Sequence, residues 1–583
     1  MRKNLLFYSA IVGSAAMLTV IQAPTNLSFL AWVALVPFIL ACSPEVKVKR
    51  LFITAYLVSL CYWLGNLYWM LPVTPGGWIA FCMYTALLWP IAAVCLRYCR
   101  GKKIPLFLVA PILFVGAERL QGIFLGGFFW RHLSHSQYAN ITLIQIADIF
   151  GAAGVSFLIA MVNGLAAELI IAAEEKKIFK IGNLLKAALA GGAVAGAVIY
   201  GQYRINESGK YIEAGPLVAA VQTNVPQFVK KSHQSSEEIL EELLKNSRAS
   251  IEAGAELVVW PETMVQATLD KRILNRITDE YDCKTVDKIL REHSKGKAFV
   301  LAGAYGGTLK MGDDFTFDLA ERYNSAFLYK PDGTAAEEQY SKIHLVAFGE
   351  YIPFKKGFPP LYNLLIKLTP YDYDYTLDAG SEYTVFKMTG KEKPASPLLG
   401  EAEGRRSQGQ EYKFSVIICY EDAVPEIARR FAIDEKDKKN IDWLVNISNN
   451  GWFVRFANNK VSPSTESGQQ AAICIFRAVE NRLAVVRSVN TGISCLIDSV
   501  GRIRNGYIAG TLPHEAMART GMAGWFVDRV PIDKRSTFFS RYGQWLDFCC
   551  AICFVLLMIM PALGRFLFRK GPKNTQKQAK KQE

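Results

Sequence analysis

Long apolar runs fill most of the first 200 residues of the chain and return once near its end. A helix needs about 20 consecutive apolar residues to cross a bilayer. The pattern therefore predicts seven membrane-spanning helices before residue 203 and one after residue 544. The clear runs are 4–22, 27–43, 51–72, 77–96, 147–173 and 545–568, and the weaker ones are 104–117, which carries two prolines, and 187–201, which is rich in Ala and Gly.

Between residues 204 and 544 the apolar runs are short and are separated by polar and turn-forming residues. Helical patterns over Ser235–Ala255 and Ser467–Arg482 alternate with runs typical of buried strands, which predicts a layered α/β fold. The polar, Pro- and Gly-rich stretch 389–412 is predicted to be a surface insertion. The expected strands are Leu217–Val221, Leu257–Trp260, Ala298–Ala302, Ser325–Tyr329, Phe414–Cys419, Trp443–Ile447 and Leu483–Val489.

The two patterns divide the chain into four parts. We expect a transmembrane domain over 1–203, a domain outside the cytoplasm over 204–544, a last transmembrane helix over 545–568 and a basic cytoplasmic tail over 569–583. The second part is long enough to enclose one large core.

Charge and composition agree with a membrane protein. Of 583 residues, 51% are hydrophobic and only 20% are charged, and 66 Lys and Arg against 52 Asp and Glu give a net charge of +14. If Met1 starts in the cytoplasm, the basic residues gather in the cytoplasmic loops and tail, whereas the outer turns 23–26 and 73–76 carry none. This positive-inside pattern explains the charge without a nucleic-acid partner. The first run also fits a signal peptide, which leaves the following residues on the same side.

The cysteines and histidines give no metal or redox signature. Most of the twelve Cys lie in or beside apolar runs, and the six His form no zinc motif. The sequence also lacks a phosphate loop and a dinucleotide fingerprint. We therefore expect neither a metal nor a cofactor.

Three polar residues end or follow predicted strands. Glu262 follows one strand, Lys342 lies in a loop, and Cys419 ends another strand. Taken singly, each has an ordinary structural interpretation. Together they make a chemical unit, because a thiol needs a base to lose its proton and a nearby ammonium favours the thiolate and an oxyanion.

The motifs around these residues resemble a known family. WPET (260–263), KIHLVAFGEY (342–351) and CYED (419–422) are similar to the Glu–Lys–Cys nitrilase superfamily. The fuller set is similar to its membrane branch, the bacterial apolipoprotein N-acyltransferase family. That set adds VQTNVPQ (221–227), NISNNGWF (446–453), RAVENRLAVVRSVNTGIS (477–494), FLGGFFWRHLSHSQY (124–138), GAAGVSFLIAMVN (151–163) and RYGQW (541–545).

The resemblance implies a fold and residue roles. The fold would be a nitrilase-like αββα sandwich inserted between transmembrane helices, seven before it and one after. Glu262 would be the general base, Lys342 the oxyanion stabiliser and Cys419 the nucleophile. Glu350, Tyr420 and Glu421 would support the site, and Trp452, Phe453 and Trp130 would face the substrate. This chain has Ala347, Gln470 and Gln544 where the family usually has Pro, His and Asp.

The resemblance also implies a reaction. A phospholipid, expected to be phosphatidylethanolamine, would pass an acyl chain through a Cys thioester to the α-amine of diacylated apolipoproteins. The enzyme would be a monomer in the bacterial inner membrane, with its catalytic domain on the periplasmic side. Two alternatives stay open: a membrane-tethered amidase with the same three residues, and an inactive membrane scaffold.

Three polar residues fall in or near the sixth predicted span. Asp148, Asn163 and Glu168 are costly in a bilayer and are often functional there. Interfacial placement of Asp148 and interhelical hydrogen bonds of the other two are the alternative to a role with substrate.

Overall fold

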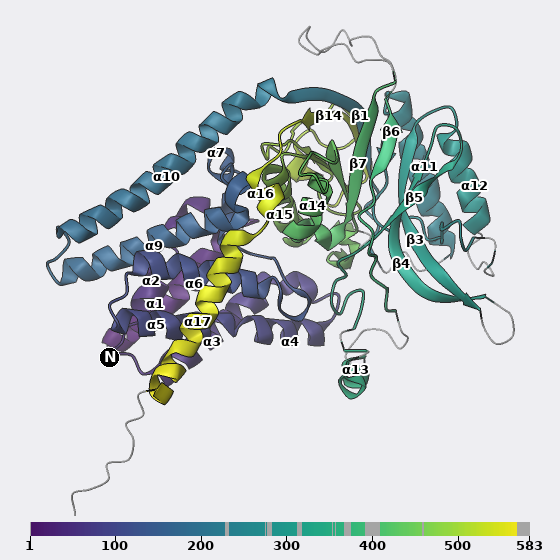
Figure 1. Ribbon diagram of the computed structural model, residues 1–583. Helices are drawn as coiled ribbons and strands as arrows, with labels where there is room; N and C mark the ends of the chain where they lie inside the picture. Colours follow the sequence, from purple (N-terminus) through teal and green to yellow (C-terminus); the bar gives the residue numbers. More distant parts are fainter. Residues whose placement is uncertain are drawn as a thin grey trace, which may run out of the picture.

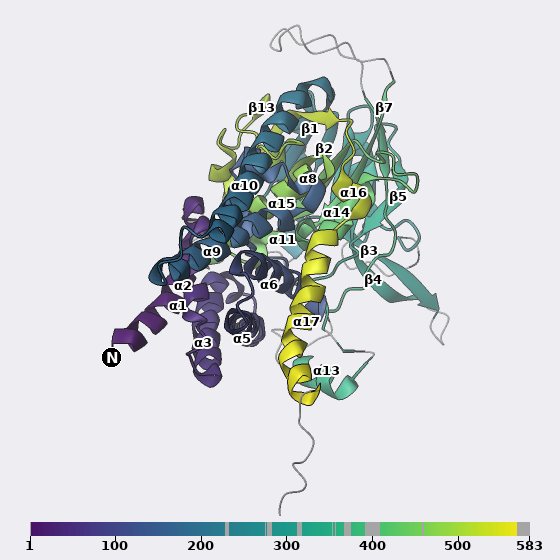
Figure 2. The same cartoon turned by 60° about the vertical axis from the view of Figure 1, so that its left-hand side comes forward.

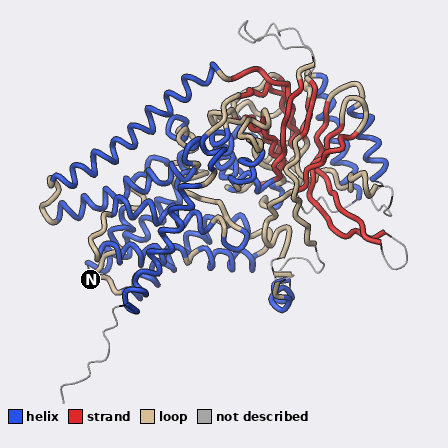
Figure 3. The backbone as a smooth tube through the Cα atoms, in the orientation of Figure 1, coloured by secondary structure: helices blue, strands red, loops and turns tan. Residues whose placement is uncertain are grey.

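The protein has one part that consists of helices and another in which helices cover the sheets. The computed structural model describes residues 2–227, 233–274, 276, 283–311, 317–352, 354–355, 357–366, 375–390, 409–457 and 460–567. Figure 3 shows a helical part built from the first 200 residues and the last helix, beside a part that contains the sheets. The tail 569–583 and most of the predicted insertion, residues 391–408, lie outside the described residues.

Apolar helices make up the first part. Three stretches are long and apolar enough to cross a membrane, namely Pro75–Gly101, Ala152–Glu174 and Ile181–Lys210, and four shorter apolar helices accompany them among the described residues. The protein is therefore a membrane protein, and the number of spans stays a prediction. The helices are α1 (Arg2–Val20), α2 (Val36–Ala41), α3 (Val48–Asn66), α4 (Pro75–Thr85), α5 (Leu88–Gly101), α6 (Leu106–Gln121), α7 (Ile141–Ile144), α8 (Ala147–Phe150), α9 (Ala152–Glu174) and α10 (Ile181–Glu207).

The last helix returns to this part from the far end of the chain. Helix α17 (Trp545–Leu567) packs along α6 (Figure 1). A Cβ atom at Gly116 of α6 would lie only 2.7 Å from the carbonyl oxygen of Cys550. Glycine at this position therefore permits the close approach of the two helices. Figure 2 shows α10 on another side, running up from the helical part to strand β1.

The expected single helix over 27–43 is broken in the structure. A 3-10 turn (Ser28–Trp32) and the short helix α2 replace it. Asn163 on α9 fills the gap, because its side chain accepts a hydrogen bond from the Leu35 amide at 2.8 Å and donates one to the Ala31 carbonyl at 2.9 Å. Backbone groups freed inside a membrane domain need such partners. Asn163 therefore forms interhelical hydrogen bonds, and its side chain is not free to contact a substrate.

Two sheets form the centre of the second part. A seven-stranded sheet has the order β13-β14-β1-β2-β3-β4-β5, and a five-stranded sheet has the order β12-β11-β8-β7-β6. The strands are β1 (Ile212–Gln222), β2 (Leu257–Val259), β3 (Phe299–Met311), β4 (Phe317–Tyr329), β5 (Ala335–Ser341), β6 (Phe386–Thr389), β7 (Glu411–Ile418), β8 (Trp443–Ser448), β9 (Arg455–Ala457), β10 (Lys460–Ser462), β11 (Ala484–Val489), β12 (Cys495–Ile497), β13 (Ala509–Gly510) and β14 (Gly524–Asp533).

The sheets pack face to face, and helices cover their outer faces. On β1, Val218 and Ala220 belong to the core shared with the second sheet, whereas Ala219 and Val221 pack beneath the covering helices. This alternation is the period of a strand that is buried on both faces. The predicted mixed α/β fold is confirmed. The covering helices are α11 (His233–Glu252) and α12 (Cys283–Ser294) on one side, and α14 (Pro425–Ala432) and α15 (Glu466–Asn481) on the other. Two further helices of this part are α13 (Pro359–Ile366) and α16 (Phe538–Tyr542).

The sheet topology brings strand ends together. Strand β2 pairs in parallel with β1 and with β3. In the other sheet, β8 pairs in parallel with β7 and with β11. The carboxyl ends of β7 and β8 meet at one edge of the five-stranded sheet. The residues that follow β2 of the facing sheet meet them there, since the Asn449 amide after β8 donates to Glu262 after β2. All three of these segments carry residues that the sequence singled out.

Candidate active site

Cys419 lies where β7 ends. It is the first residue of a 3-10 turn (Cys419–Ala423) and has a backbone φ of 52°. A non-glycine residue pays a steric penalty in this left-handed region, and such strain is commonly held at functional sites. The side chain is partly exposed, in contrast to the buried strand before it. The turn therefore presents the thiol at the edge of the sheet.

A buried cluster of two carboxylates and one ammonium faces this thiol. The Lys342 Nζ lies 2.8 Å from Glu350 Oε1 and 3.5 Å from Glu262 Oε1. The other carboxylate oxygen of Glu262 accepts a hydrogen bond from the Asn449 amide at 2.8 Å. Lys342 is only 1% exposed, so its charge is held by these partners rather than by water. The structure thus brings together Glu262, Lys342, Glu350 and Cys419 from three separate segments, since Lys342 and Glu350 share the loop after β5.

Asn324 on β4 completes the cluster. Its side-chain Nδ2 donates to Glu262 Oε1 at 2.6 Å and to Glu350 Oε1 at 3.2 Å. Its backbone carbonyl oxygen accepts a hydrogen bond from the Lys342 backbone amide. One amide group therefore holds both carboxylates in place. Sequence reasoning missed this residue, and the only signal was a polar side chain directly before the predicted apolar strand Ser325–Tyr329.

The charges of this cluster set the protonation of the two reactive groups. Burial opposes the charge of Lys342, but Glu350 and Glu262 outweigh it and the pKa of Lys342 is raised. Burial and the Glu262 carboxylate raise the pKa of the Cys419 thiol, against the opposing effect of Lys342. The resting state is therefore a neutral thiol beside a charged lysine. A thiol in this state needs a base to accept its proton before it can attack.

Glu421 connects the turn Cys419–Ala423, here called the candidate nucleophile turn, to the loop that holds Lys342. Its Oε1 accepts hydrogen bonds from the Ile343 and His344 amides at 2.7 and 3.0 Å, and its Oε2 accepts from the Ile418 amide at 2.7 Å. The Tyr340 hydroxyl donates to it as well. Burial raises the pKa of Glu421 to about 7, although the backbone donors favour its charge. This side chain fixes the spacing between Cys419 and Lys342.

Tyr420 connects the same turn to the helical part. Its hydroxyl oxygen accepts a hydrogen bond from the Phe129 amide at 2.7 Å. Its ring stacks on Trp130 with a centroid distance of 6.2 Å. The Trp130 indole is fixed in turn by a 2.6 Å hydrogen bond to Gln469. The loop after α6 and the candidate nucleophile turn are thus packed as one unit.

Aromatic rings continue from this point into the helical part. The Trp69 ring lies 5.6 Å from Trp130 and 4.9 Å from Phe453, and Phe128 stacks on Trp130 at 5.9 Å. Trp452 lies in the adjoining turn Asn450–Trp452 and is half-buried. Sequence reasoning named Trp130, Trp452 and Phe453 but missed Trp69, because nothing local distinguishes it from other tryptophans of an apolar run.

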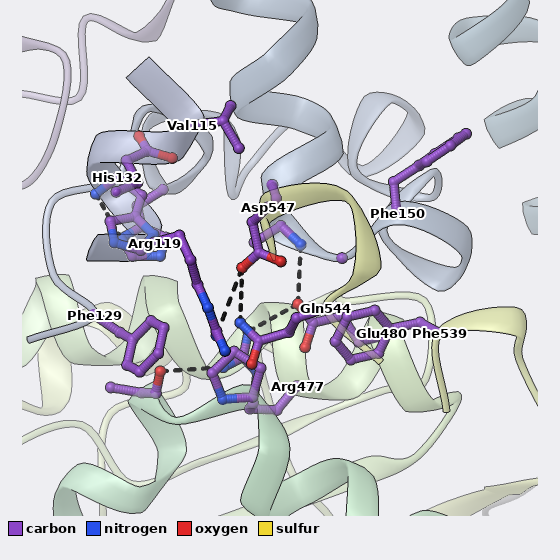
Figure 4. Close-up of a pocket in the computed structure, with 17 residues that line it drawn as sticks. Val115, Arg119, Phe129, His132, Phe150, Arg477, Glu480, Phe539, Gln544 and Asp547 are labelled. Atoms are coloured by element: carbon purple, nitrogen blue, oxygen red, sulfur yellow. Dashed lines mark hydrogen bonds and ion pairs between the residues drawn. The ribbon is translucent and has the colours of Figure 1, made fainter. Parts of the chain in front are cut away.

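A separate polar cavity, drawn in Figure 4, lies next to the end of the turn Cys419–Ala423. It is lined by Arg119 of α6, Asp547 of α17 and Arg477 of α15, with Ala423 on its wall. Two ion pairs lie in its wall, since Arg119 lies 3.8 Å from Asp547 and Arg477 lies 2.8 Å from Glu480. Its volume is about 30 Å³, which is room for one or two water molecules. The cavity joins membrane helices to α15 and is too small for a lipid.

The other polar residues of the sixth predicted span also have protein partners. Asp148 lies 2.8 Å from Arg204 and 2.7 Å from Arg482. Glu168 forms an ion pair with Lys186. These contacts join α8 to α10 and α15, and α9 to α10, and they favour the structural interpretation of these residues. No group of three His, Cys, Asp or Glu residues suited to a metal occurs in the part of the chain that the structure describes.

Comparisons with known proteins identify the family of this chain. Residues 217–511, just over half of the chain, match the carbon–nitrogen hydrolase family, and the protein belongs to that family. Residues 14–165 match the N-terminal domain of apolipoprotein N-acyltransferase. The protein is thus a member of the apolipoprotein N-acyltransferase family, the membrane branch of the nitrilase superfamily.

Similar relatives extend over nearly the whole chain. The apolipoprotein N-acyltransferase of Geobacter metallireducens is 29% identical over 93% of this chain and 93% of its own length. That of Thermotoga maritima is 26% identical over 98% of this chain and 95% of its own. Among solved structures, an amidase from Nesterenkonia sp. covers 56% of this chain and 95% of its own, with 16% identity and a TM-score of 0.32.

Proposed function

We propose that this protein transfers a fatty acyl chain from a phospholipid to the N-terminal α-amine of a diacylglyceryl-cysteine apolipoprotein. The observation that carries the proposal is the buried Glu262–Lys342–Glu350 cluster that faces the thiol of Cys419. Family membership gives the class of reaction, and the cluster supplies the groups that such a reaction needs.

The first half-reaction acylates the enzyme. Glu262 accepts the proton of the Cys419 thiol as the sulfur attacks the ester carbonyl of the phospholipid. Lys342, held charged by Glu350, stabilises the tetrahedral oxyanion. Collapse of this intermediate breaks the ester bond, and the lysophospholipid leaves with the proton that Glu262 held. An acyl thioester remains on Cys419.

The second half-reaction discharges the thioester. The α-amine of the apolipoprotein attacks the thioester carbonyl and forms an amide, and Cys419 recovers its proton. A covalent intermediate divides one difficult transfer into two easier steps, which predicts ping-pong kinetics. No metal or cofactor has a place in this scheme.

The aromatic rings support a lipid substrate. Trp69, Phe128 and Trp130 belong to the helical part and lie beside Tyr420, the neighbour of the nucleophile. An acyl chain that rises from the bilayer along these rings reaches the thiol without crossing open water. In this proposal Trp130, Trp452 and Phe453 contact the lipid.

The same proposal fixes the topology. Seven spans in 1–203 and one in 545–568 hold the 204–544 domain on the periplasmic side of the bacterial inner membrane. The 569–583 tail is cytoplasmic. The donor is phosphatidylethanolamine, whose acyl chains lie in the outer leaflet at the level of the site, and the enzyme acts as a monomer.

The intact mass of the detergent-purified protein tests the proposal. Wild type incubated with phosphatidylethanolamine gains one acyl mass that hydroxylamine removes, whereas Cys419→Ala gains none. Addition of a diacylated lipopeptide then removes the adduct and yields a triacylated product. Release of free fatty acid alone supports the amidase or lipase alternative. No adduct on folded wild type contradicts the mechanism and favours the scaffold.

A further inference from the structure

A buried chain of hydrogen bonds runs behind the candidate active site. Asn450 lies at its centre, in the turn that carries Trp452 and Phe453. The Asn450 Nδ2 donates to Glu466 Oε2 at 2.6 Å and to Gln470 Oε1 at 3.0 Å. Its Oδ1 accepts from the Ser448 hydroxyl at 2.9 Å. Both polar ends of this side chain are therefore held by neighbours.

The same chain reaches the candidate nucleophile turn. The Gln470 Oε1 also accepts a hydrogen bond from Arg487 at 3.0 Å, and Arg487 lies 2.7 Å from Asp422 Oδ2. Asp422 is three residues after Cys419 in the turn Cys419–Ala423. Each of these side chains is at most 2% exposed. Glu466 and Gln470, both on α15, thus stand between the turn of the nucleophile and the turn of Phe453.

The turn Asn450–Trp452 also positions the aromatic side chain of Phe453, which follows it. The Phe453 amide donates to the Asn450 carbonyl at 3.0 Å. The Phe453 ring meets Trp69 edge to face, with centroids 4.9 Å apart. Trp69 is 5% exposed and belongs to the helical part. A shift of Asn450 therefore moves Phe453 relative to Trp69.

We propose that Glu466 and Gln470 are positioning residues that hold the Asn450–Phe453 turn against Trp69 and so fix the width of the acyl-chain path. The inference rests on the proposed function, since it takes Phe453 and Trp69 as the walls that contact the donor lipid. Neither Glu466 nor Gln470 touches the substrate. Their effect is transmitted through Asn450.

Glu466→Ala tests the proposal in the intact-mass assay, run at increasing concentrations of phosphatidylethanolamine in mixed micelles. Loss of one buried hydrogen bond of about 1 kcal/mol predicts a rise of roughly fivefold in the half-saturating donor concentration, with a maximal acylation rate close to that of wild type. Glu466→Gln keeps an oxygen acceptor for Asn450 and restores the wild-type value. Gln470→Ala is expected to behave as Glu466→Ala does.

A matched control separates this effect from general loss of stability. Glu256 is a buried carboxylate of the same domain that accepts a hydrogen bond from the Leu217 amide. Glu256→Ala is expected to lower the melting temperature without changing the half-saturating donor concentration. An equal rise in that concentration for Glu256→Ala and Glu466→Ala overturns the proposal.

A double-mutant cycle with Phe453→Ala gives the sharpest result. If Glu466 acts through Phe453, the double variant binds donor no more weakly than Phe453→Ala alone. Additive effects overturn the proposal, as does a lower maximal rate with an unchanged half-saturating concentration. The wild-type adduct is measured in parallel, so a failure of the proposed function is seen as the absence of acylation in every sample.

Discussion

The hydroxyl oxygen of Tyr420 accepts a hydrogen bond from the amide of Phe129 at 2.7 Å, across 291 positions of the chain. Tyr420 follows Cys419, the candidate nucleophile, and Phe129 lies in the loop after α6. This contact fastens the candidate nucleophile turn to the helical part that embeds the protein in the membrane. The position of the thiol relative to the lipid is therefore set by packing between the two parts.

Tyr420→Phe removes this acceptor and keeps the ring. The Phe129 amide then lacks its partner at a cost of about 1–3 kcal/mol, which predicts a fall of about 5- to 150-fold in the acylation rate. The measurement is the rate of adduct formation by intact mass. Tyr507→Phe serves as the control. It removes a hydroxyl that donates to the Leu512 carbonyl, far from Cys419 in sequence, and the variant is expected to acylate at the wild-type rate.

Glu262→Gln tests the general base. Because the pKa of Cys419 is raised, the thiol is neutral at pH 7 and cannot attack unaided. Loss of the base predicts a fall of about 10²–10⁴-fold in the acylation rate. The remaining rate is expected to increase as pH rises, since hydroxide then generates the thiolate directly. A rate within threefold of wild type at pH 7 argues against this role.

Lys342→Met is expected to abolish acylation and to weaken the fold. The variant leaves Glu262 and Glu350 buried without their cation, and removal of one partner of a buried pair costs about 3–5 kcal/mol. The double variant Lys342→Met/Glu350→Gln removes one of the unpaired charges. It is expected to recover part of the melting temperature but none of the acylation. Recovery of both assigns Lys342 a structural role only.

The stability of the protein is expected to depend on pH through Glu466. Burial and the charge of Asp422 raise the pKa of Glu466 from 4.5 to about 8 in the folded state. Between these two values the unfolded chain has lost the proton that the folded protein keeps, so folding becomes less favourable as pH rises. Glu466→Gln does not titrate. Relative to wild type, its melting temperature is therefore expected to rise from pH 4.5 to pH 8.

Melting temperatures of wild type and Glu466→Gln across this range check the prediction. The difference between them is expected to be constant below pH 4.5 and again above pH 8. A difference that stays the same across the whole range shows that Glu466 does not change its protonation on unfolding.

Much of the catalytic domain could be predicted because its signals are local. Three of the seven predicted strands lie within observed ones, and each of the other four overruns its strand by a single residue. Those four are Leu257–Trp260, Ala298–Ala302, Phe414–Cys419 and Leu483–Val489. A strand that is buried on both faces appears in the sequence as a short apolar run, whichever strands it pairs with. Glu262 and Cys419 are candidates for the same reason, since each follows or ends such a run. Lys342 is a candidate because of the loop motif around it.

The helical part was harder to predict in detail. The run 27–43 is apolar throughout, but the structure breaks it, and Asn163 supplies the hydrogen bonds that the break requires. An apolar run indicates that a segment is shielded from water, but it does not indicate at which residue a helix in that segment ends. The stop depends on a residue more than 120 positions away.

The sequence by itself determined the kind of environment for each segment and the chemical groups available for a reaction. Apolar runs, strand runs and reactive side chains are properties of neighbouring residues, so they can be recognised along the chain. The tertiary structure alone decided that Asn324 holds Glu262 and Glu350, that Trp69 meets Phe453, and that Glu421 spaces Cys419 from Lys342. These contacts join strands and helices that are distant along the chain, and their geometry follows from how the two sheets and the membrane helices pack.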